Sequence, residues 1–354
     1  MQLDQILSAA VRGGASDVVL KTGCLPRFRY RGDLVAPENG VVITPELMLS
    51  WLQKLLPESK RDLRKERDFA YQTPEGNRFR VNAFMQRGLI TVVARVVLGH
   101  IRSLDELHLP PVITNLTKEV RGLILVTGVT GSGKSTTLAA MIDRINRTRA
   151  AHILTIEDPI EYLIRDELSV VEQREIGLDT ESFETALRAA MRQNPDVIMI
   201  GEMRDRETVE TALRAAETGH LVLSTLHTSD ALESLGRLTG MFSGAAADNI
   251  RHSMARTLKA VISQRLVPRA DGRGMVASVE IMVVSGAIKE LILEGAGFSG
   301  IRQLIKDGRD TYGMQTFDDS LASLVTNGMV SRADALNYAS SRQELELTLA
   351  GVGQ

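Results

Sequence analysis

The stretch GLILVTGVTGSGKSTTLAAMID, residues 122–143, decides the fold of this protein. It begins with an apolar run typical of a buried strand and ends with the spacing of an amphipathic helix. Between them lies GVTGSGKS, which fits the pattern GxxxxGK[ST] of a phosphate-binding loop. That pattern is specific when a strand precedes it and a helix follows, and both are present here. The stretch therefore predicts a P-loop.

The residues of this loop have distinct expected roles. Its glycines let backbone N–H groups wrap around phosphate oxygens, and the amino end of the following helix attracts negative charge. Lys134 is expected to reach the β- and γ-phosphates, and Ser135 to ligate magnesium. We therefore predict ATP and Mg as ligands. The predicted nucleotide-binding residues are Gly128, Thr130, Gly131, Ser132, Gly133, Lys134, Ser135 and Thr136.

Composition limits the class of protein. The 354 residues are enough for two domains, each with its own core. A formal net charge of −2 and an aromatic content of 4% disfavour a protein that coats nucleic acid or stacks on its bases. The single Cys24 excludes an internal disulfide and zinc modules built from several cysteines. No apolar run reaches the length of a membrane span, so we expect a cytoplasmic protein whose membrane contact is peripheral.

Residues 1–100 predict a small α+β domain. RFRVNAF (78–84) and LITVVARVV (89–97) have the composition of two strands joined in a hairpin. Strand alternation places Arg80 on the face opposite the apolar side chains. The mixed-charge run RDLRKERD (61–68) is interpreted as a solvated face. The polar, proline-containing stretch that follows the hairpin predicts a linker over residues 101–118.

Residues 119–354 predict an α/β domain with a mostly parallel sheet. Short apolar strands alternate with amphipathic helices, which is typical of βαβ units. The predicted strands are GLILVTG, HILTIED, DVIMIGE and HLVLSTLHT. Residues 245–267 carry apolar side chains along one stripe and are predicted to form a single helix. From about residue 285 the sequence predicts a tail of shorter helices.

Acidic residues follow two of the predicted strands. Glu202 comes after VIMIG, at the sheet edge where ligands bind, and is expected to reach magnesium directly or through water. Glu157, Asp158 and Glu161 cluster after HILTI, and their repulsion predicts either a nearby cation or a retained proton. One of these acids would handle the attacking water, and spacing does not identify which. Glu157 and Asp158 are also candidate metal ligands. The alternative is that these acids only complement a helix dipole.

Two histidines flank the strand in GHLVLSTLHT. His220 precedes it and His227 follows it. Neither has cysteine or carboxylate companions at the spacing of a zinc site, so a metal centre is disfavoured. A polar sensor of the γ-phosphate at the strand end would suit Thr225 or His227. For His220, a core or surface position is the competing interpretation.

These motifs, in this order, resemble the secretion and type IV pilus ATPases, and most closely the pilus retraction members of that family. Beside the P-loop, the resemblance is carried by HILTIEDPIEY, DVIMIGEMRD, AAETGHLVLSTLHT, AVISQRLVPR and YGMQTFDDSL. It implies a RecA-like ATPase core, a PAS-like amino-terminal domain and a ring of six subunits. In this family the magnesium strand ends in Gly-Glu, so the missing aspartate is no departure and the resemblance implies competent ATP hydrolysis.

The resemblance also implies roles for individual residues of this sequence. By motif position, Glu161 looks like the catalytic glutamate, Glu202 like the Walker B glutamate and His227 like the histidine-box residue. Glu157 and Asp158 complete the acidic box.

The resemblance further implies that arginines of the amino-terminal strands reach a nucleotide. The matching positions are Arg80 and Arg95. In other phosphoryl-transfer systems, an arginine acting in this way contributes roughly a thousandfold or more in rate. From the sequence alone, each would instead be interpreted as a solvated or interdomain arginine.

Two sites, the P-loop and a later element, depart from the family pattern. Val129 replaces a proline at a variable P-loop position, which should leave the phosphate cradle intact. The element AIRNLI, associated with retraction, is AIKELI here, with Lys289 in place of arginine and Glu290 in place of asparagine. Arginine-to-lysine exchange loses a planar, bidentate fork, and the charge change alters a surface that a partner could contact.

The leading hypothesis is therefore a hexameric ATPase motor for pilus retraction. Its expected partners are further copies of itself and an inner-membrane platform protein, at the cytoplasmic face of the inner membrane. The altered AIKELI keeps open an accessory ATPase that works beside a second retraction ATPase. An extension or secretion ATPase is disfavoured, because those relatives carry longer amino-terminal domains and a four-cysteine zinc motif.

Two hypotheses come from other classes. A RecA-like nucleic-acid motor would need a basic, aromatic surface and would bind with a steep salt dependence. No nucleic acid is expected as a partner here. A nucleotide-gated structural subunit would bind ATP without useful turnover, and intact Glu161 and Glu202 argue against it.

Overall fold

The chain divides into two compact units, which are described separately below. The computed structural model describes residues 2–30, 32–37, 40–56, 66–97, 99–295, 298 and 300–351. The smaller unit comprises Met1–His100 and Pro159–Leu163, and the larger comprises Ile101–Asp158 and Ile164–Gln354. Most of the mixed-charge run predicted as a solvated face lies outside the described residues.

The smaller unit is an α+β structure, as the sequence predicts. Its described strands form one antiparallel sheet in the order β3-β2-β1-β6-β5-β4. Its elements are α1 (Leu3–Arg12), β1 (Asp17–Lys21), β2 (Arg27–Tyr30), β3 (Asp33–Val35), α2 (Pro45–Leu55), β4 (Arg67–Gln72), β5 (Arg78–Gln86) and β6 (Leu89–Val96).

The predicted hairpin of this unit is present. Strands β5 and β6 pair in antiparallel register, and both Arg87 and Gly88 at the turn have positive φ, as a two-residue hairpin of the primed type requires. Phe79 and Val81 are fully buried, whereas Arg80 between them is exposed. The alternation therefore sorts the apolar side chains into the core that helices α1 and α2 share with the sheet.

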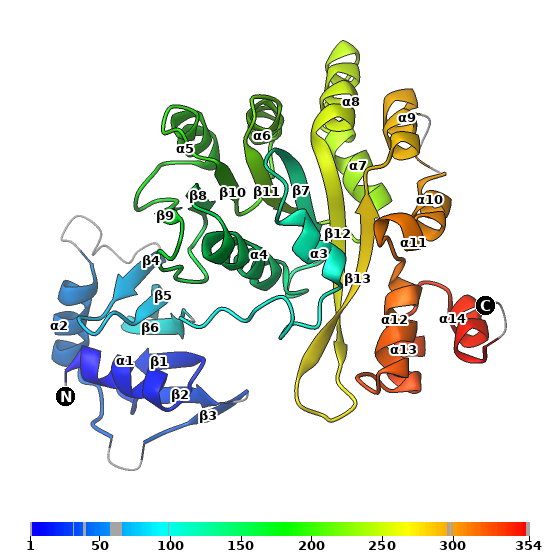
Figure 1. Ribbon diagram of the computed structural model, residues 1–354. Coiled ribbons are helices and arrows are strands. Elements are labelled where there is room, and N and C mark those ends of the chain that lie inside the picture. Colours follow the sequence, from blue (N-terminus) through cyan, green and yellow to red (C-terminus); the bar gives the residue numbers. More distant parts are fainter. Residues whose placement is uncertain are drawn as a thin grey trace. The chain divides into compact units, whose positions relative to one another are not determined.

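The larger unit alternates strands and helices and ends in a helical tail (Figure 1). Its elements are α3 (Pro111–Leu116), β7 (Gly122–Thr127), α4 (Lys134–Thr148), β8 (His152–Glu157), β9 (Val170–Glu175), α5 (Phe183–Ala190), β10 (Val197–Ile200), α6 (Arg206–Glu217), β11 (Leu221–Leu226), α7 (Ala231–Gly240), α8 (Ala245–Thr257), β12 (Leu258–Pro268), β13 (Met275–Val283), α9 (Gly286–Glu294), α10 (Ile301–Asp307), α11 (Arg309–Tyr312), α12 (Phe317–Thr326), α13 (Arg332–Tyr338) and α14 (Arg342–Leu349).

Strand β7, which leads into the predicted P-loop, lies inside the sheet of this unit. The described strands run in the order β13-β12-β7-β11-β10-β8-β9, and all neighbours are parallel except β12 and β13. Because β7, β10 and β11 are parallel, the residues that follow them emerge at the same edge of the sheet. The mostly parallel α/β core predicted from the sequence is confirmed.

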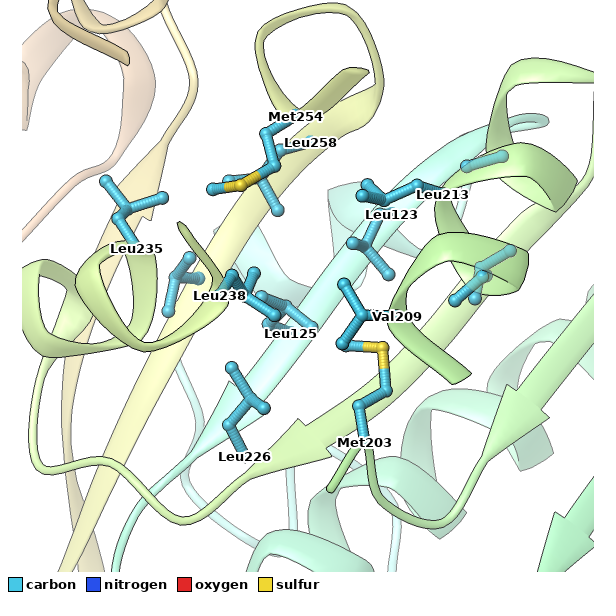
Figure 2. Close-up of a cluster of buried hydrophobic side chains, with 14 of the residues drawn as sticks. Leu123, Leu125, Met203, Val209, Leu213, Leu226, Leu235, Leu238, Met254 and Leu258 are labelled. Atoms are coloured by element: carbon cyan, nitrogen blue, oxygen red, sulfur yellow. The ribbon is translucent and has the colours of Figure 1, made fainter. Parts of the chain in front are cut away.

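Apolar cores cover both faces of this sheet. One core packs the sheet against α5 to α8, and Figure 2 shows Leu123 and Leu125 of β7 beneath Val209 and Leu213 of α6. The other packs the opposite face against α3 and α4. Strands β7, β8, β10 and β11 thus bury both of their faces, which explains why they appear in the sequence as nearly continuous apolar runs.

The helix predicted over residues 245–267 is wrong in its second half. Helix α8 ends at Thr257, and residues from Leu258 onward form β12, which pairs with β7 on one side and β13 on the other. Because β12 is buried on both faces, it lacks a strict alternation of apolar and polar residues, and its apolar residues match helical spacing by chance. The β-branched Val261 and Ile262 favour the strand.

Two further expectations concern the flanks of the larger unit. The stretch predicted as a linker, residues 101–118, contains α3, and its apolar residues pack in the core beside α4 rather than spanning solvent. The buried members are Leu104, Leu109, Ile113 and Leu116. The tail predicted from about residue 285 is present as helices α9 to α14.

Candidate active site

The P-loop connects β7 to α4 through a turn that only glycine permits at its start. Gly128, Gly131 and Gly133 all have positive φ, at 147°, 80° and 90°. A Cβ atom on Gly128 would lie 2.4 Å from the Ser132 hydroxyl oxygen and 2.6 Å from the Gln264 carbonyl oxygen. The loop therefore folds back against strand β12, and the absence of a side chain makes that close approach possible.

The loop presents donors that suit an anionic phosphate. Helix α4 begins at Lys134 and runs for 15 residues, and its first N–H groups lack partners within the helix. The Lys134 ammonium donates to the carbonyl oxygens of Gly128 at 2.8 Å and Val129 at 3.0 Å, so it lies across the loop. The buried Ser132 hydroxyl has no hydrogen-bond partner among the described residues. This is a donor-rich cradle for a phosphate chain.

Glu202 and His227 meet at the carboxyl edge of the sheet. Glu202 follows β10 and His227 follows the neighbouring parallel strand β11, and the imidazole Nε2 lies 3.3 Å from the Glu202 carboxylate. Two bonds tie the strand ends together: the Thr225 hydroxyl donates to the Gly201 carbonyl at 2.6 Å, and the Met203 N–H donates to the Thr225 carbonyl at 3.1 Å. The pairing of β10 with β11 thus determines the position of the Glu202 carboxylate relative to the His227 imidazole.

A third group on Glu202 was not predicted from the sequence. Arg204 Nε donates to the Glu202 carboxylate at 2.7 Å. The Glu202 side chain is only 11% exposed, whereas that of Arg204 is 70% exposed. A mostly buried carboxylate needs such partners, because desolvation otherwise disfavours its charge. The short motif GEMRD carried this signal, since it sets an arginine two residues after the acid.

The acidic box does not act as one cluster in the larger unit. Glu157, at the end of β8, accepts hydrogen bonds from the Thr155 hydroxyl at 2.7 Å and the Gln173 amide at 3.0 Å. It is therefore engaged within the β8–β9 pair, while Asp158 is exposed. Glu161 is also exposed and belongs to Pro159–Leu163, the segment that clusters with the smaller unit.

The oxygen ligands at the sheet edge suit a magnesium ion that is also held by phosphate and water. They do not suit a metal ion that is coordinated by protein side chains alone. Ser135 offers a hydroxyl oxygen and Glu202 a carboxylate, which are the oxygen ligands that magnesium prefers. Among the described residues, no group of three His, Cys, Asp or Glu side chains could hold a metal ion. A P-loop magnesium takes most of its ligands from phosphate and water, so this sparse set of side chains is sufficient.

The predicted arginines lie side by side on the exposed face of the smaller unit's sheet. Arg80 of β5 and Arg95 of β6 are direct cross-strand partners. Arg95 Nε donates to Asp17 at 2.9 Å, and Arg29 lies 3.6 Å from the same carboxylate. Burial alone would raise the pKa of Asp17, but hydrogen bonds from Arg95 and Ser16 and the arginine charges outweigh it and lower that pKa. Arg80 has no ion-pair partner among the described residues.

His220 lies at the other end of β11 from His227. Its Nδ1 lies 2.9 Å from the Ala215 carbonyl oxygen and 3.2 Å from the Thr218 hydroxyl. These contacts tie the end of α6 to the start of β11, away from the carboxyl edge of the sheet. The local structural interpretation of His220 therefore fits its place in the fold.

A cavity of about 340 Å³ adjoins the end of the P-loop. Gly133, Thr136 and Thr137 form one wall, where α4 begins. The remaining wall combines apolar and charged side chains, among them Leu107, Leu266, Met275, Arg102 and Arg273. Arg102 and Leu107 come from the stretch predicted as a linker, and no local pattern predicts their place beside the loop.

Comparison with known proteins identifies the family. A sequence profile described as Type II/IV secretion system protein matches residues 2–285. The chain belongs to the Type II/IV secretion system protein family. The members of this family most relevant here include the type IV pilus ATPase PilU of Pseudomonas aeruginosa, which is 39% identical over 352 residues covering 99% of this chain and 91% of PilU. The type IV pilus retraction ATPase PilT of the same organism is 40% identical over 346 residues, covering 96% of this chain and 98% of PilT.

A solved structure agrees with this assignment. The crystal structure of the pilus retraction motor PilT with bound ADP matches the present fold with a TM-score of 0.89 at 39% identity, covering 98% of this chain and 99% of that one. As a Type II/IV secretion system protein of the PilT and PilU type, the chain is an ATP-hydrolysing enzyme with a RecA-like core. No helix in the described part of the chain is both long and apolar enough to cross a membrane.

Proposed function

We propose that this ATPase is a motor that powers type IV pilus retraction and twitching motility. The observation that carries the proposal is similarity of about 40% along nearly the whole chain to PilT and PilU, together with an intact P-loop and the Glu202–His227 pair. The motor acts as a homohexamer at the cytoplasmic face of the inner membrane. It is held there by a membrane platform protein, and none of the helices in its described residues could cross the bilayer.

The site residues divide the chemistry among them. Residues 128–136 bind the phosphates, and Lys134 neutralises charge on the β- and γ-phosphates. Ser135 and Glu202, the latter directly or through water, would hold magnesium, which would supply positive charge against the developing charge on the phosphate oxygens. Glu161 orients and deprotonates the attacking water. His227 reports on the γ-phosphate through its contact with Glu202.

The cavity beside the P-loop takes the ribose and base of ATP. Gly133 and Thr136, at the end of the P-loop, line it. Its volume of about 340 Å³ and its mixed walls suit a nucleoside, because such ligands combine an apolar ring with polar edges.

Arg80 and Arg95 complete the site of a neighbouring subunit in the ring. This role rests on the family resemblance and on their shared, exposed sheet face. Of the two, Arg80 is the better placed to move to a phosphate, because Arg95 already bonds Asp17 at 2.9 Å. If both subunits contribute to the site, hydrolysis will require the assembled ring.

An accessory role remains the second candidate, and helix α9 is the observation that favours it. The substituted Lys289 and Glu290 are both exposed, whereas Ile288 and Ile292 of the same helix are fully buried. The substitutions therefore change a surface and leave the packing of α9 intact. A changed partner contact would fit an ATPase that works beside a primary retraction motor.

The deciding experiment counts surface pili and measures twitching in cells that lack the gene. Excess pili without twitching are expected, restored by the parent chain and by Lys118→Ala but not by Lys134→Ala. Lys118 is a matched control, since it is an exposed lysine of the same unit outside the P-loop. Bald cells would instead indicate an extension motor, and near-normal pili with weak retraction an accessory one. Purified parent chain should sediment as a hexamer.

A further inference from the structure

A glutamate lies inside the core of the larger unit, on a strand that contributes nothing to the P-loop. Glu280 of β13 is 4% exposed, and its neighbours along the strand, Val279 and Ile281, are fully buried. A carboxylate in such a place costs free energy unless something in the fold uses its charge or its hydrogen-bonding capacity.

Glu280 bonds the first residue of helix α7. Its carboxylate accepts a hydrogen bond from the Ala231 N–H at 3.0 Å, in a fully buried setting. Ala231 begins α7, and the side chain of Asp230 caps that helix. The N–H groups of a first turn have no partner inside the helix, so the carboxylate satisfies a donor that would otherwise be orphaned. The positive end of the helix dipole favours the same negative charge.

The bonded residue closes the turn that carries His227. Only three residues, Thr228 to Asp230, separate His227 from Ala231. Within that turn the Thr228 and Ser234 hydroxyls bond at 2.7 Å, and the Ser229 N–H donates to Glu233 at 2.7 Å. These bonds stiffen the turn against α7, while Glu280 ties α7 to the sheet.

Glu280 is also the end of a polar row at the carboxyl edge of the sheet. It stands opposite Ser263 of β12, and Ser263 stands opposite Thr127 of β7, the last residue before the P-loop. The Thr127 hydroxyl donates to the Ser263 hydroxyl at 2.9 Å. Leu235 and Leu238 of α7 are buried in the core on this face of the sheet, and Figure 2 shows Leu238 beside Leu125 of β7, so the helix packs on the same side as the row.

We propose that Glu280 is a positioning residue for hydrolysis, which fixes the amino end of α7 and thereby holds His227 against Glu202. It acts through Ala231 and the turn, and it does not touch the nucleotide. Burial raises the pKa of Glu280, the Ala231 N–H opposes that rise, Asp230 adds to it, and the charges of Arg302 and Arg265 oppose it. The inference rests on the proposed role of His227.

The test compares three variants of the full-length chain by steady-state ATP turnover. Glu280→Met removes the acceptor, and kcat should fall about tenfold or more while KM for ATP stays within about twofold. Glu280→Gln keeps an acceptor oxygen, so it should stay within about threefold of the parent kcat. Ser278→Ala is the control, because Ser278 is a buried polar residue on the same face of β13 that contacts α12. It should behave like the parent.

A second measurement does not depend on any variant folding. Hydrogen exchange resolved to single amides should show strong protection of the Ala231 N–H in the parent chain. The first residue of α6, Arg206, is the comparison, because its helix is also capped by an aspartate. Equal, fast exchange at both amides would overturn the proposal, as would an unchanged kcat in Glu280→Met or equal losses in Glu280→Met and Ser278→Ala.

Failure of the inference can be told apart from failure of the proposed function. His227→Ala is measured beside the other variants. If His227→Ala turns over ATP at the parental rate, the proposed role of His227 is wrong, and the positioning role of Glu280 falls with it. The exchange rate of the Ala231 N–H would then test only the contact between Glu280 and α7. A slow His227→Ala with a fully active Glu280→Met would refute the positioning role and keep the proposed site.

Discussion

Replacing Gly128 with alanine should damage the P-loop in a way that the structure lets us size. The residue has a φ of 147°, outside the region that L-amino acids adopt readily, and holding another residue there costs about 1–3 kcal/mol. The new Cβ would lie 2.6 Å from the Gln264 carbonyl oxygen. That oxygen belongs to β12, which is paired on both sides and cannot retreat, so overpacking adds about 1–3 kcal/mol.

The two terms sum to about 2–6 kcal/mol, which the chain can relieve by opening the loop. Opening separates the donors that surround the phosphates, so the strain should appear as lost nucleotide affinity. A loss of about 2 kcal/mol corresponds to roughly thirtyfold weaker binding. We therefore expect Gly128→Ala to bind a fluorescent ATP analogue at least about thirtyfold more weakly than the parent, with the fold retained by circular dichroism.

Gly131→Ala provides the matched control for the steric part of this estimate. Gly131 also has a positive φ, at 80°, but a Cβ there would meet nothing within 4 Å. Gly131→Ala should therefore suffer only backbone strain of about 1 kcal/mol, which corresponds to roughly fivefold weaker nucleotide binding. Titrations that show Gly128→Ala binding within about threefold of the parent would refute the reasoning. Equal losses in the two variants would show that the contact with β12 is not the cause.

Three other predictions follow from the described contacts. Lys134→Ala should abolish tight nucleotide binding, whereas Glu161→Ala should still bind ATP and turn over about a hundredfold more slowly, and equal loss of binding in both would contradict the assigned roles. Arg95→Ala should lower the melting temperature because it takes the closest cation from Asp17, by a contribution of about 1 kcal/mol, while Arg80→Ala should not, which thermal melting of both variants will test. Because burial raises the pKa of Glu280 above 4.5, its contribution to stability is present below that pH and is lost as the pH rises through the folded-state value. Urea unfolding of Glu280→Gln should therefore show a gain over the parent at neutral pH that shrinks toward pH 4.5, and a constant gain would contradict it.

The sequence specified the parts of the fold whose signals are local. The P-loop, its flanking strand and helix, and the hairpin of the smaller unit each follow from spacing within a dozen residues. Strand β12 was mistaken for helix because burial on both faces removes the alternation that distinguishes a strand. Its neighbours β7 and β13 are distant in sequence, so the pairing that makes it a strand is invisible to a local pattern.

The candidate site was predictable residue by residue but not pair by pair. Glu202 and His227 each follow an apolar strand, which predicts a site role for each, and the parallel pairing of β10 with β11 brings them together. Arg204 was missed because an exposed arginine after a strand has many possible roles. Glu280 gave no signal at all, since an acid within an apolar strand looks like a solvated position until the helix that covers it is known.

Buried carboxylates of the larger unit each have polar partners at or beside the carboxyl edge of the sheet. Each must be compensated, because a desolvated charge without a partner is unstable. Glu157 is held by two side-chain donors from its own sheet, and Glu202 by an arginine and a histidine. In the described part of the chain, Glu280 accepts a hydrogen bond only from the backbone N–H of Ala231, so helix α7 provides its hydrogen-bonding partner while the charges of Arg302 and Arg265 add support. Any motion that moves α7 away from the sheet would break the hydrogen bond from Ala231 and leave the Glu280 carboxylate buried without a donor, which is unfavourable in free energy. The position of His227 is therefore coupled to the packing of α7 on the sheet.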